Sequence, residues 1–286
     1  MTVLHLADER EAADLAAFLS RLLHYDRAAA VRLQAAGTAL AVFGRPPSFE
    51  VLAIRAVRLA KPYENGLDVT LDVTVSAGEL LEALDETAAT AHVPAAVTGP
   101  PWAGVLPPRR GWRAAEPGLP GPDALRALVS AAVTEFRTRT GQLAPEARTR
   151  AELDTIGRDI WSRTVGDTRL PVRAVHAAQS LGFLRATGPT GSATASGASE
   201  HSGTSQSVGP SPAALASGSA VHAQPESAGS SAYARPAGSA RSSEPRGSSG
   251  EVVLLASGAW LRLRTPYGSI AVRGEGLGAG LGLSVR

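Results

Sequence analysis

A strand–glycine–strand pattern occurs twice in this chain of 286 residues, and it constrains the fold more than any other feature. Val31–Val42 and Val252–Leu263 carry Val, Leu, Ala, Gly and Leu at the same offsets. Apolar residues that alternate on both sides of a glycine are typical of two strands joined by a tight turn. Each copy then passes through a proline-containing turn into a closing strand, Leu52–Arg55 or Ile270–Arg273. The pattern predicts an α+β fold of two helix-plus-antiparallel-meander units, and the repeat favours a duplication.

A low-complexity segment lies between the helices and the strands of the second unit. Residues 188–250 consist almost wholly of Ser, Gly, Ala, Pro and Thr, so they cannot bury enough apolar surface to offset the entropy lost on ordering. We expect a long disordered linker there. The strands that follow are too apolar to be stable as an isolated hairpin, which predicts that they return to the body formed before residue 187. The linker is therefore interpreted as an insertion in the second unit.

Local signals mark where several helices begin. Asp8 with Glu11, Ser76 with Glu79 and Thr149 with Glu152 each have the spacing of an N-cap and its reciprocal partner. Pro171 and Gly182 predict the start and the end of a further helix. Together with the strand pattern, these signals predict five segments: 1–93 as the first α+β unit, 94–120 as a Pro/Gly/Trp-rich connecting loop, 121–187 plus 251–275 as the second α+β unit, 188–250 as the linker, and 276–286 as a Gly-rich tail.

The composition favours a cytoplasmic protein that does not enter a membrane. The net charge is only +2, with a single lysine against many arginines, and there is no cysteine to form a disulfide or a thiolate metal site. The first residues lack a charged segment followed by an apolar core, so we expect no signal peptide. No apolar run approaches the length that spans a bilayer. The histidines outside the linker lack the spacing of metal ligands, so we expect neither a metal nor a cofactor.

The connecting loop concentrates the residue types that usually bind partners. Trp102 and Trp112 flank Arg109 and Arg110, and such a set can bind an anion, stack on a base or form a protein-binding hot spot. The alternative interpretation is a structural strap. In that case the tryptophans cap a core, and the arginines pair with carboxylates of the acidic segment 61–95.

A second candidate site lies on the helices of the second unit. Helix, helix and two-stranded hairpin is the chain order of a winged-helix DNA-binding module, and arginines on those helices would supply positive charge. Acidic neighbours reduce this charge: Asp154 and Asp159 precede two of the arginines by four residues, which predicts pairs with them. The candidate nucleic-acid residues are Arg158, Arg163, Arg169 and Arg173.

Three classes of function follow from these observations. The leading hypothesis is a non-catalytic cytoplasmic interaction or regulatory protein with an unidentified protein partner, because no catalytic constellation stands out. The second is a nucleic-acid-binding protein that uses the winged-helix-like module. The third is an enzyme or small-ligand binder at the interface of the two units, near Arg109 and Trp112. Between an enzyme and a protein without catalytic activity, the sequence favours the latter.

Three strings of this sequence are distinctive: Trp102–Trp112, Arg150–Arg163 and Trp260–Arg273. In these strings the chain is similar to an uncharacterised family from GC-rich Gram-positive bacteria that is described only by domains of unknown function. The resemblance extends over most of the chain outside the linker. It implies no activity.

Overall fold

The computed structural model describes residues 2–63, 71–102, 104–115, 117–185 and 251–274. The linker expected at 188–250 and the tail expected at 276–286 lie outside these residues. The described residues belong to one compact unit.

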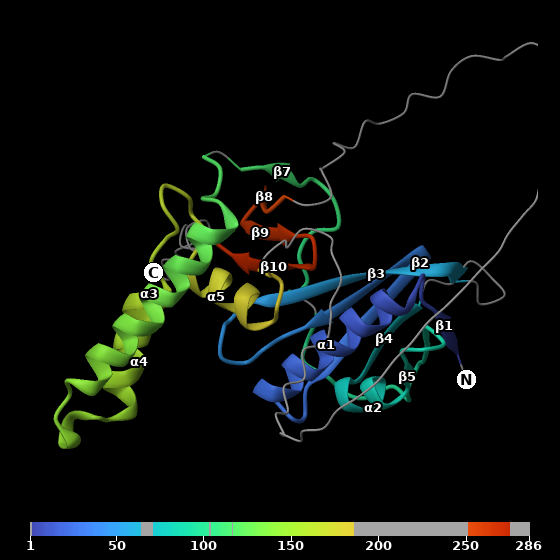
Figure 1. Ribbon diagram of the computed structural model, residues 1–286, viewed down its shortest axis with the longest axis horizontal. Coiled ribbons are helices and arrows are strands. Elements are labelled where there is room, and N and C mark those ends of the chain that lie inside the picture. The colour runs from blue at the N-terminus through green and yellow to red at the C-terminus, as the bar shows by residue number, and fades with distance from the viewer. Residues whose placement is uncertain (1, 64–70, 103, 116, 186–250, 275–286) are drawn as a thin grey trace, which may run out of the picture. The chain divides into compact units, whose positions relative to one another are not determined.

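Strands from both predicted units meet in one antiparallel sheet, which confirms the α+β class (Figure 1). The two halves join where Leu52, Ala53 and Ile54 of β3 pair with Ala271, Ile270 and Ser269 of β10. Among the described residues the sheet has seven strands, in the order β4 (Leu71–Ser76), β2 (Ala30–Gly44), β3 (Leu52–Tyr63), β10 (Gly268–Arg273), β9 (Trp260–Thr265), β8 (Val253–Ser257) and β7 (Arg113–Ala114).

The first copy of the repeated pattern differs from the prediction. Instead of a hairpin, 31–42 lies within the single strand β2, whose first half pairs with β4 and whose second half pairs with β3. Gly37 has a φ of 56°, and the register to β3 shifts between Gly37 and Ala39. Gly258 has the same φ but lies in the turn of a true hairpin, β8–β9. A left-handed glycine suits a bulge as well as a turn, so the long-range pairing decides between them.

A smaller sheet and a short helix lie beside the N-terminal strands. The small sheet has the order β1 (Val3–His5), β6 (Thr90–His92) and β5 (Leu84–Asp85). The helix α2 (Ala77–Glu82) begins at Ser76, whose side chain accepts a hydrogen bond from the Glu79 amide. The predicted cap is thus confirmed, and it places Leu80 in the core.

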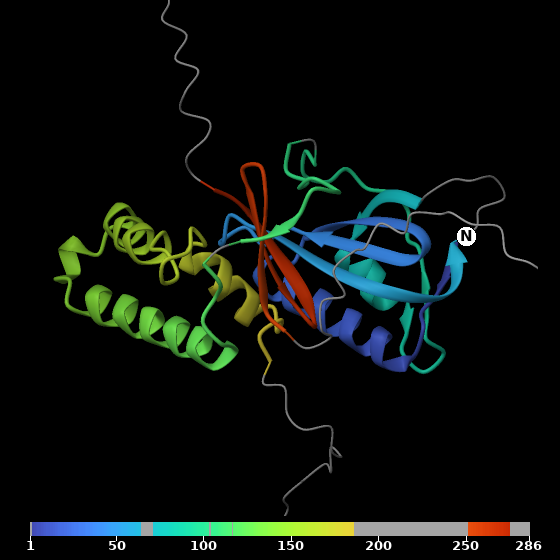
Figure 2. The same ribbon diagram turned by 90° about the horizontal axis from the view of Figure 1, so that it is seen from above.

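The longer helices begin where the sequence predicted. Asp8 caps α1 (Glu9–Tyr25) by accepting from the Glu11 amide at 2.8 Å, and Thr149 caps α4 (Arg150–Trp161). In the view of Figure 2, α1 lies along β3, and α3 (Pro122–Gly141) lies beside α4. A single 3-10 turn, Pro145–Ala147, connects α3 to α4.

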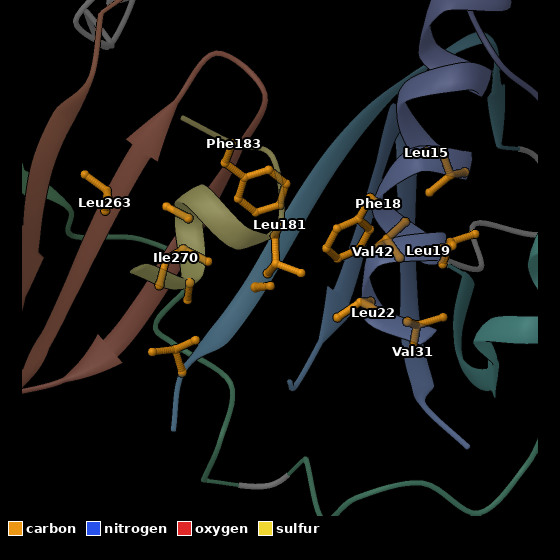
Figure 3. Close-up of a cluster of buried hydrophobic side chains, with 14 of the residues drawn as sticks. Leu15, Phe18, Leu19, Leu22, Val31, Val42, Leu181, Phe183, Leu263 and Ile270 are labelled. Carbon is orange, nitrogen blue, oxygen red and sulfur yellow. The ribbon is translucent and has the colours of Figure 1, made fainter. Parts of the chain in front are cut away.

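The end of α5 (Val172–Ser180) directs an aromatic ring into the core shared by both halves. Gly182 has a φ of 74°, and the Phe183 amide reaches back to the Ala178 carbonyl at 2.7 Å. This ending turns Phe183 toward α1, where its ring stacks on Phe18 at 5.5 Å between centroids. Figure 3 shows Phe183 beside the strands that carry Leu263 and Ile270, with Phe18 on the α1 side.

A buried arginine ties α1 to the opposite half of the sheet. Arg55 of β3 is 5% exposed and donates to Glu11 at 2.8 Å, with Asp14 at 3.4 Å. Its other terminal nitrogen donates to the Tyr267 carbonyl at 2.7 Å, in the turn before β10. One guanidinium therefore holds a helix of the first half and a turn of the second.

His176 of α5 lies between two aromatic rings. It stacks on Trp161 of α4 at 4.5 Å between centroids and meets the edge of Phe49 at 5.1 Å. Burial lowers the pKa of His176 below its ordinary value of 6.5, since the charged form is disfavoured away from water.

Leu33 and Leu254, the third position of each repeat copy, are 0% and 3% exposed. We expect Leu33→Asp and Leu254→Asp each to lower the free energy of unfolding by on the order of 3 kcal/mol or more, because an unpaired carboxylate would be buried. Urea denaturation measures this change. Thr38→Asp, at an exposed position of β2, is the matched control and should unfold close to wild type. Unchanged midpoints in either core variant would contradict the assignment of these residues to the core.

The lowered pKa of His176 predicts a pH-dependent stability. Below its ordinary pKa of 6.5 the unfolded chain binds a proton that the folded chain resists, so stability falls as the pH drops through this range. His176→Phe keeps a ring between Trp161 and Phe49 but cannot titrate. We expect the melting temperature of wild type to fall more than that of the variant between about pH 7.5 and about pH 5.5. Equal losses in the two proteins would show that His176 does not contribute.

Candidate functional site

The two tryptophans of the connecting loop have different environments. Trp102 is 7% exposed and packs with Phe43, Leu52 and Ile54 on the side of the sheet opposite α1 and α5, which we call the outer face. Ala271 completes this small cluster. Trp102 therefore acts as part of a strap over the sheet, as the alternative interpretation expected, and its ring is not available to a partner.

Trp112 instead lies half-exposed over the outer face. Its indole nitrogen donates to the Pro108 carbonyl at 2.8 Å, which fixes the ring. The guanidinium carbon of Arg262, on β9, is 5.8 Å from the centre of that ring. Cation–π contact of this kind is attractive even when the cation is partly exposed.

Arg109 and Arg110 have exposed side chains beside Trp112. The Arg110 carbonyl accepts from the Ser257 hydroxyl at 3.3 Å, so the loop is attached to β8 through its backbone. Arg32, hydrogen-bonded to Asp72 at 2.6 Å, lowers the pKa of that carboxyl, and the charge of Arg109 acts in the same direction. Arg109 is thus close enough to Asp72 of the acidic segment to act on its charge.

The sequence prediction did not include the outer residues of β9 among the site residues. Leu261, Leu263 and Thr265 are buried, and the residues between them face the outer side with intermediate exposure. These outer residues are Trp260, Arg262 and Arg264. The signal was present in the string Trp-Leu-Arg-Leu-Arg-Thr, in which a strict period of two separates a leucine face from a Trp/Arg face.

Arg262 and Arg264 are neighbouring cations without a nearby counter-charge among the described residues. Within those ranges, neither has a carboxylate at ion-pair distance. Burial lowers the pKa of Arg262, and repulsion by Arg264 adds to this effect. The Arg262 Nε atom is buried and has no hydrogen-bond partner in the described part of the chain.

The candidate arginines of α4 have a different character. Arg163 makes two bonds to Glu135 of α3, at 2.7 and 2.9 Å, and a third to Asp159 at 3.0 Å. The predicted pair of Asp159 with Arg163 is confirmed. Asp154, however, pairs with Arg150 at 3.6 Å, so the predicted pair with Arg158 is wrong. Much of the positive charge of this surface is neutralised within the protein.

Arg169 and Arg173 are brought together in a cleft of about 210 Å³. The cleft lies where the segment between α4 and α5 meets the β8–β9 turn and the end of β10. Arg173 also lies 3.9 Å from Glu50. The described residues that line the cleft are Ser162, Thr164, Arg169, Pro171, Arg173, Gly258, Ala259, Leu261, Arg273 and Gly274.

A larger hollow of about 610 Å³ follows one side of α3 but offers less chemistry. It is shallow and is lined mainly by short side chains of a single helix. Its charged residues, Glu135 and Arg139, already interact with each other at 3.4 Å. We therefore consider the cleft the better candidate site.

The hairpin expected as a wing is part of the central sheet. β9 pairs with β8 and β10, and β10 pairs with β3, so these strands have no free edge among the described residues. Across the described ranges, no group of three His, Cys, Asp or Glu side chains could hold a metal ion. No helix in the described part of the chain has the length and apolarity needed to cross a bilayer.

Two families match the chain, and the boundary between them falls inside the connecting loop. Residues 1–104 match a Domain of unknown function (DUF8010), and residues 107–277 match a second Domain of unknown function (DUF8185). No curated protein and no solved structure matches the sequence significantly. Since the second match covers more than half of the chain, the protein belongs to the DUF8185 family and carries a DUF8010 domain before it.

Proposed function

We propose that this protein is a non-catalytic interaction or regulatory protein that holds an anionic group of its partner in the cleft beside α5. The observation that carries the proposal is the convergence of Arg169, Arg173 and Arg273 on one small cleft. Guanidinium groups bind phosphate and carboxylate oxygens through paired, charge-assisted hydrogen bonds.

The other residues of the cleft support an anionic occupant. The hydroxyls of Ser162 and Thr164 can donate further hydrogen bonds, and no Asp or Glu is found among the described lining residues. The first turn of α5 carries no acidic residue and no side-chain cap, so the positive end of its dipole adds to the potential. All the charged side chains among the described lining residues are cationic.

The size of the cleft limits what it can hold. Its volume of about 210 Å³ is below the roughly 300 Å³ at which pockets for whole small molecules begin. It therefore suits one phosphate or carboxylate group, or two linked groups, and the rest of the partner would lie outside. A hydroxyl nucleophile there would lack an adjacent His, Asp or Glu as general base among the described lining residues, which favours binding over catalysis.

The proposal includes a cytoplasmic location in a GC-rich Gram-positive bacterium. The absence of cysteine from the sequence is compatible with a reducing compartment, and the large excess of arginine over lysine supports a GC-rich coding sequence.

Inorganic pyrophosphate tests the cleft directly. We expect isothermal titration calorimetry at low salt to detect its binding to wild type. The double variant Arg169→Ala/Arg273→Ala should bind about tenfold or more weakly, since neither position can then form a charge-assisted hydrogen bond. Arg137→Ala removes an exposed arginine of α3 outside the cleft and should leave affinity unchanged. Absence of binding by wild type, or equal affinity in the double variant, would overturn the proposal.

A further inference from the structure

We infer that the outer face of β8, β9 and β10 binds single-stranded nucleic acid, with bases stacked on Trp112 and Trp260 and phosphates held by Arg262 and Arg264. The inference rests on the proposed function, because the adjoining cleft would hold a further phosphate of the same strand. It names the chemical class of the partner, which the cleft alone does not.

Strand geometry explains why these side chains gather on one surface. Trp260, Arg262 and Arg264 alternate with buried residues of β9, so all three emerge on the outer face. The residues of β10 paired with the two arginines are small: Ala271 lies opposite Arg262, and Ser269 lies opposite Arg264. On β8, Leu255 lies opposite Arg262 and Val253 lies opposite Arg264, so neither arginine has a carboxylate as its cross-strand neighbour.

The charge on this surface is not compensated within the described chain. Arg262 is partly desolvated and lies beside the like charge of Arg264, with no carboxylate of the described residues at ion-pair distance from either. Two such cations reduce the stability of the folded protein. An anion bound between them would reduce the repulsion through charge-assisted hydrogen bonds to the two guanidinium groups.

Each of the two aromatic rings on this surface lies beside a cation. Trp112 is fixed by its bond to the Pro108 carbonyl, and Arg262 lies at 5.8 Å from its ring centre. Arg273 lies at the same distance from the ring of Trp260. A ring with a cation beside it suits a stacked base and its neighbouring phosphate in a bound single strand.

Arg273 connects this surface to the cleft. It contacts the Trp260 ring on the outer face, and it is also one of the residues that line the cleft. Arg273 therefore offers a cation where the outer face meets the cleft.

The pairing of rings with cations selects among anionic partners. A duplex offers phosphates, but its bases are stacked inside and cannot reach Trp112 or Trp260. An acidic peptide would use the arginines and leave the rings without a specific role. A single strand offers both phosphates and exposed base faces, which are worth roughly 1–3 kcal/mol per stacked base.

Fluorescence anisotropy with labelled oligo(dT) of about 20 nucleotides tests the inference, in parallel with a duplex of equal length and a polyglutamate peptide. We expect full-length wild type to bind the single strand at least tenfold more tightly than either competitor. Preference for the duplex or for the peptide would overturn the inference.

Variants separate the contributions of charge and stacking. Arg262→Gln/Arg264→Gln should reduce the slope of log affinity against log salt by about 1.4, or about 0.7 for each phosphate that the protein no longer neutralises. Trp112→Leu should weaken binding about tenfold and leave this slope unchanged. Arg139→Ala/Arg163→Ala, at two arginines that already pair with Glu135 and Asp159, is the matched control and should bind like wild type.

Stability measurements distinguish a binding role from a structural one. Because Arg262 is desolvated and repelled, Arg262→Gln should melt at the same temperature as wild type or higher, even as affinity for oligo(dT) falls. A lower melting temperature with unchanged affinity would assign Arg262 a structural role and refute the inference.

Pyrophosphate separates failure of the inference from failure of the proposed function. If pyrophosphate binds through Arg169 and Arg273 while oligo(dT) does not bind, the cleft holds an anion and the nucleic-acid assignment is wrong. If neither probe binds, both are wrong. The inference holds only if oligo(dT) binds and both the Trp112 variant and the arginine variant weaken it.

Discussion

The fold depends on the seam between β3 and β10, where two stretches of chain from opposite ends of the sequence become one sheet. The seam has few backbone pairs, and the buried side chain of Arg55 reinforces it by bonding to α1 and to the turn before β10. Taking a guanidinium out of water is costly, and here Glu11, Asp14 and a carbonyl oxygen offset that cost. Loss of one partner would leave an uncompensated buried charge, so the halves are coupled more strongly than the pairing alone suggests.

The candidate site joins segments of the second half that are far apart in the sequence. The cleft takes its arginines from both sides of the long segment 186–250: Arg169 lies before it and Arg273 after it. Phe183, packed on Phe18, holds α5 against the sheet and so keeps the start of α5 beside the end of β10. The outer face likewise combines Trp112 of the connecting loop with β9. Both surfaces therefore depend on the return of β8, β9 and β10 to the part of the chain that precedes residue 186.

The sequence could predict what depends on local chemistry. Helix caps at Asp8, Ser76 and Thr149 follow from side-chain geometry within one turn, and the burial of Leu33 and Leu254 follows from a period of two. Long-range pairing could not be predicted in this way: the residues around Gly37 form a bulged strand because β4 and β3 are both available as partners. The prediction of the site was incomplete for the same reason. Trp102 and Trp112 share one string but lie in different environments, and the cations that converge are distant in sequence.

Arginine serves two purposes in this protein, and the difference lies in the neighbours rather than in the residue. Arg55 and Arg163 are each surrounded by carboxylates, so their charge is used to join elements of the fold. Arg262 and Arg264 lie near each other and have only uncharged cross-strand neighbours, so their charge is left to act outward. A cation that lacks a partner within the protein reduces the stability of the folded state. An anion that binds there relieves the repulsion and, by mass action, stabilises the folded state. Within the described residues, the pattern of paired and unpaired arginines therefore separates the surfaces that hold this fold together from the one that is suited to receive a charged partner.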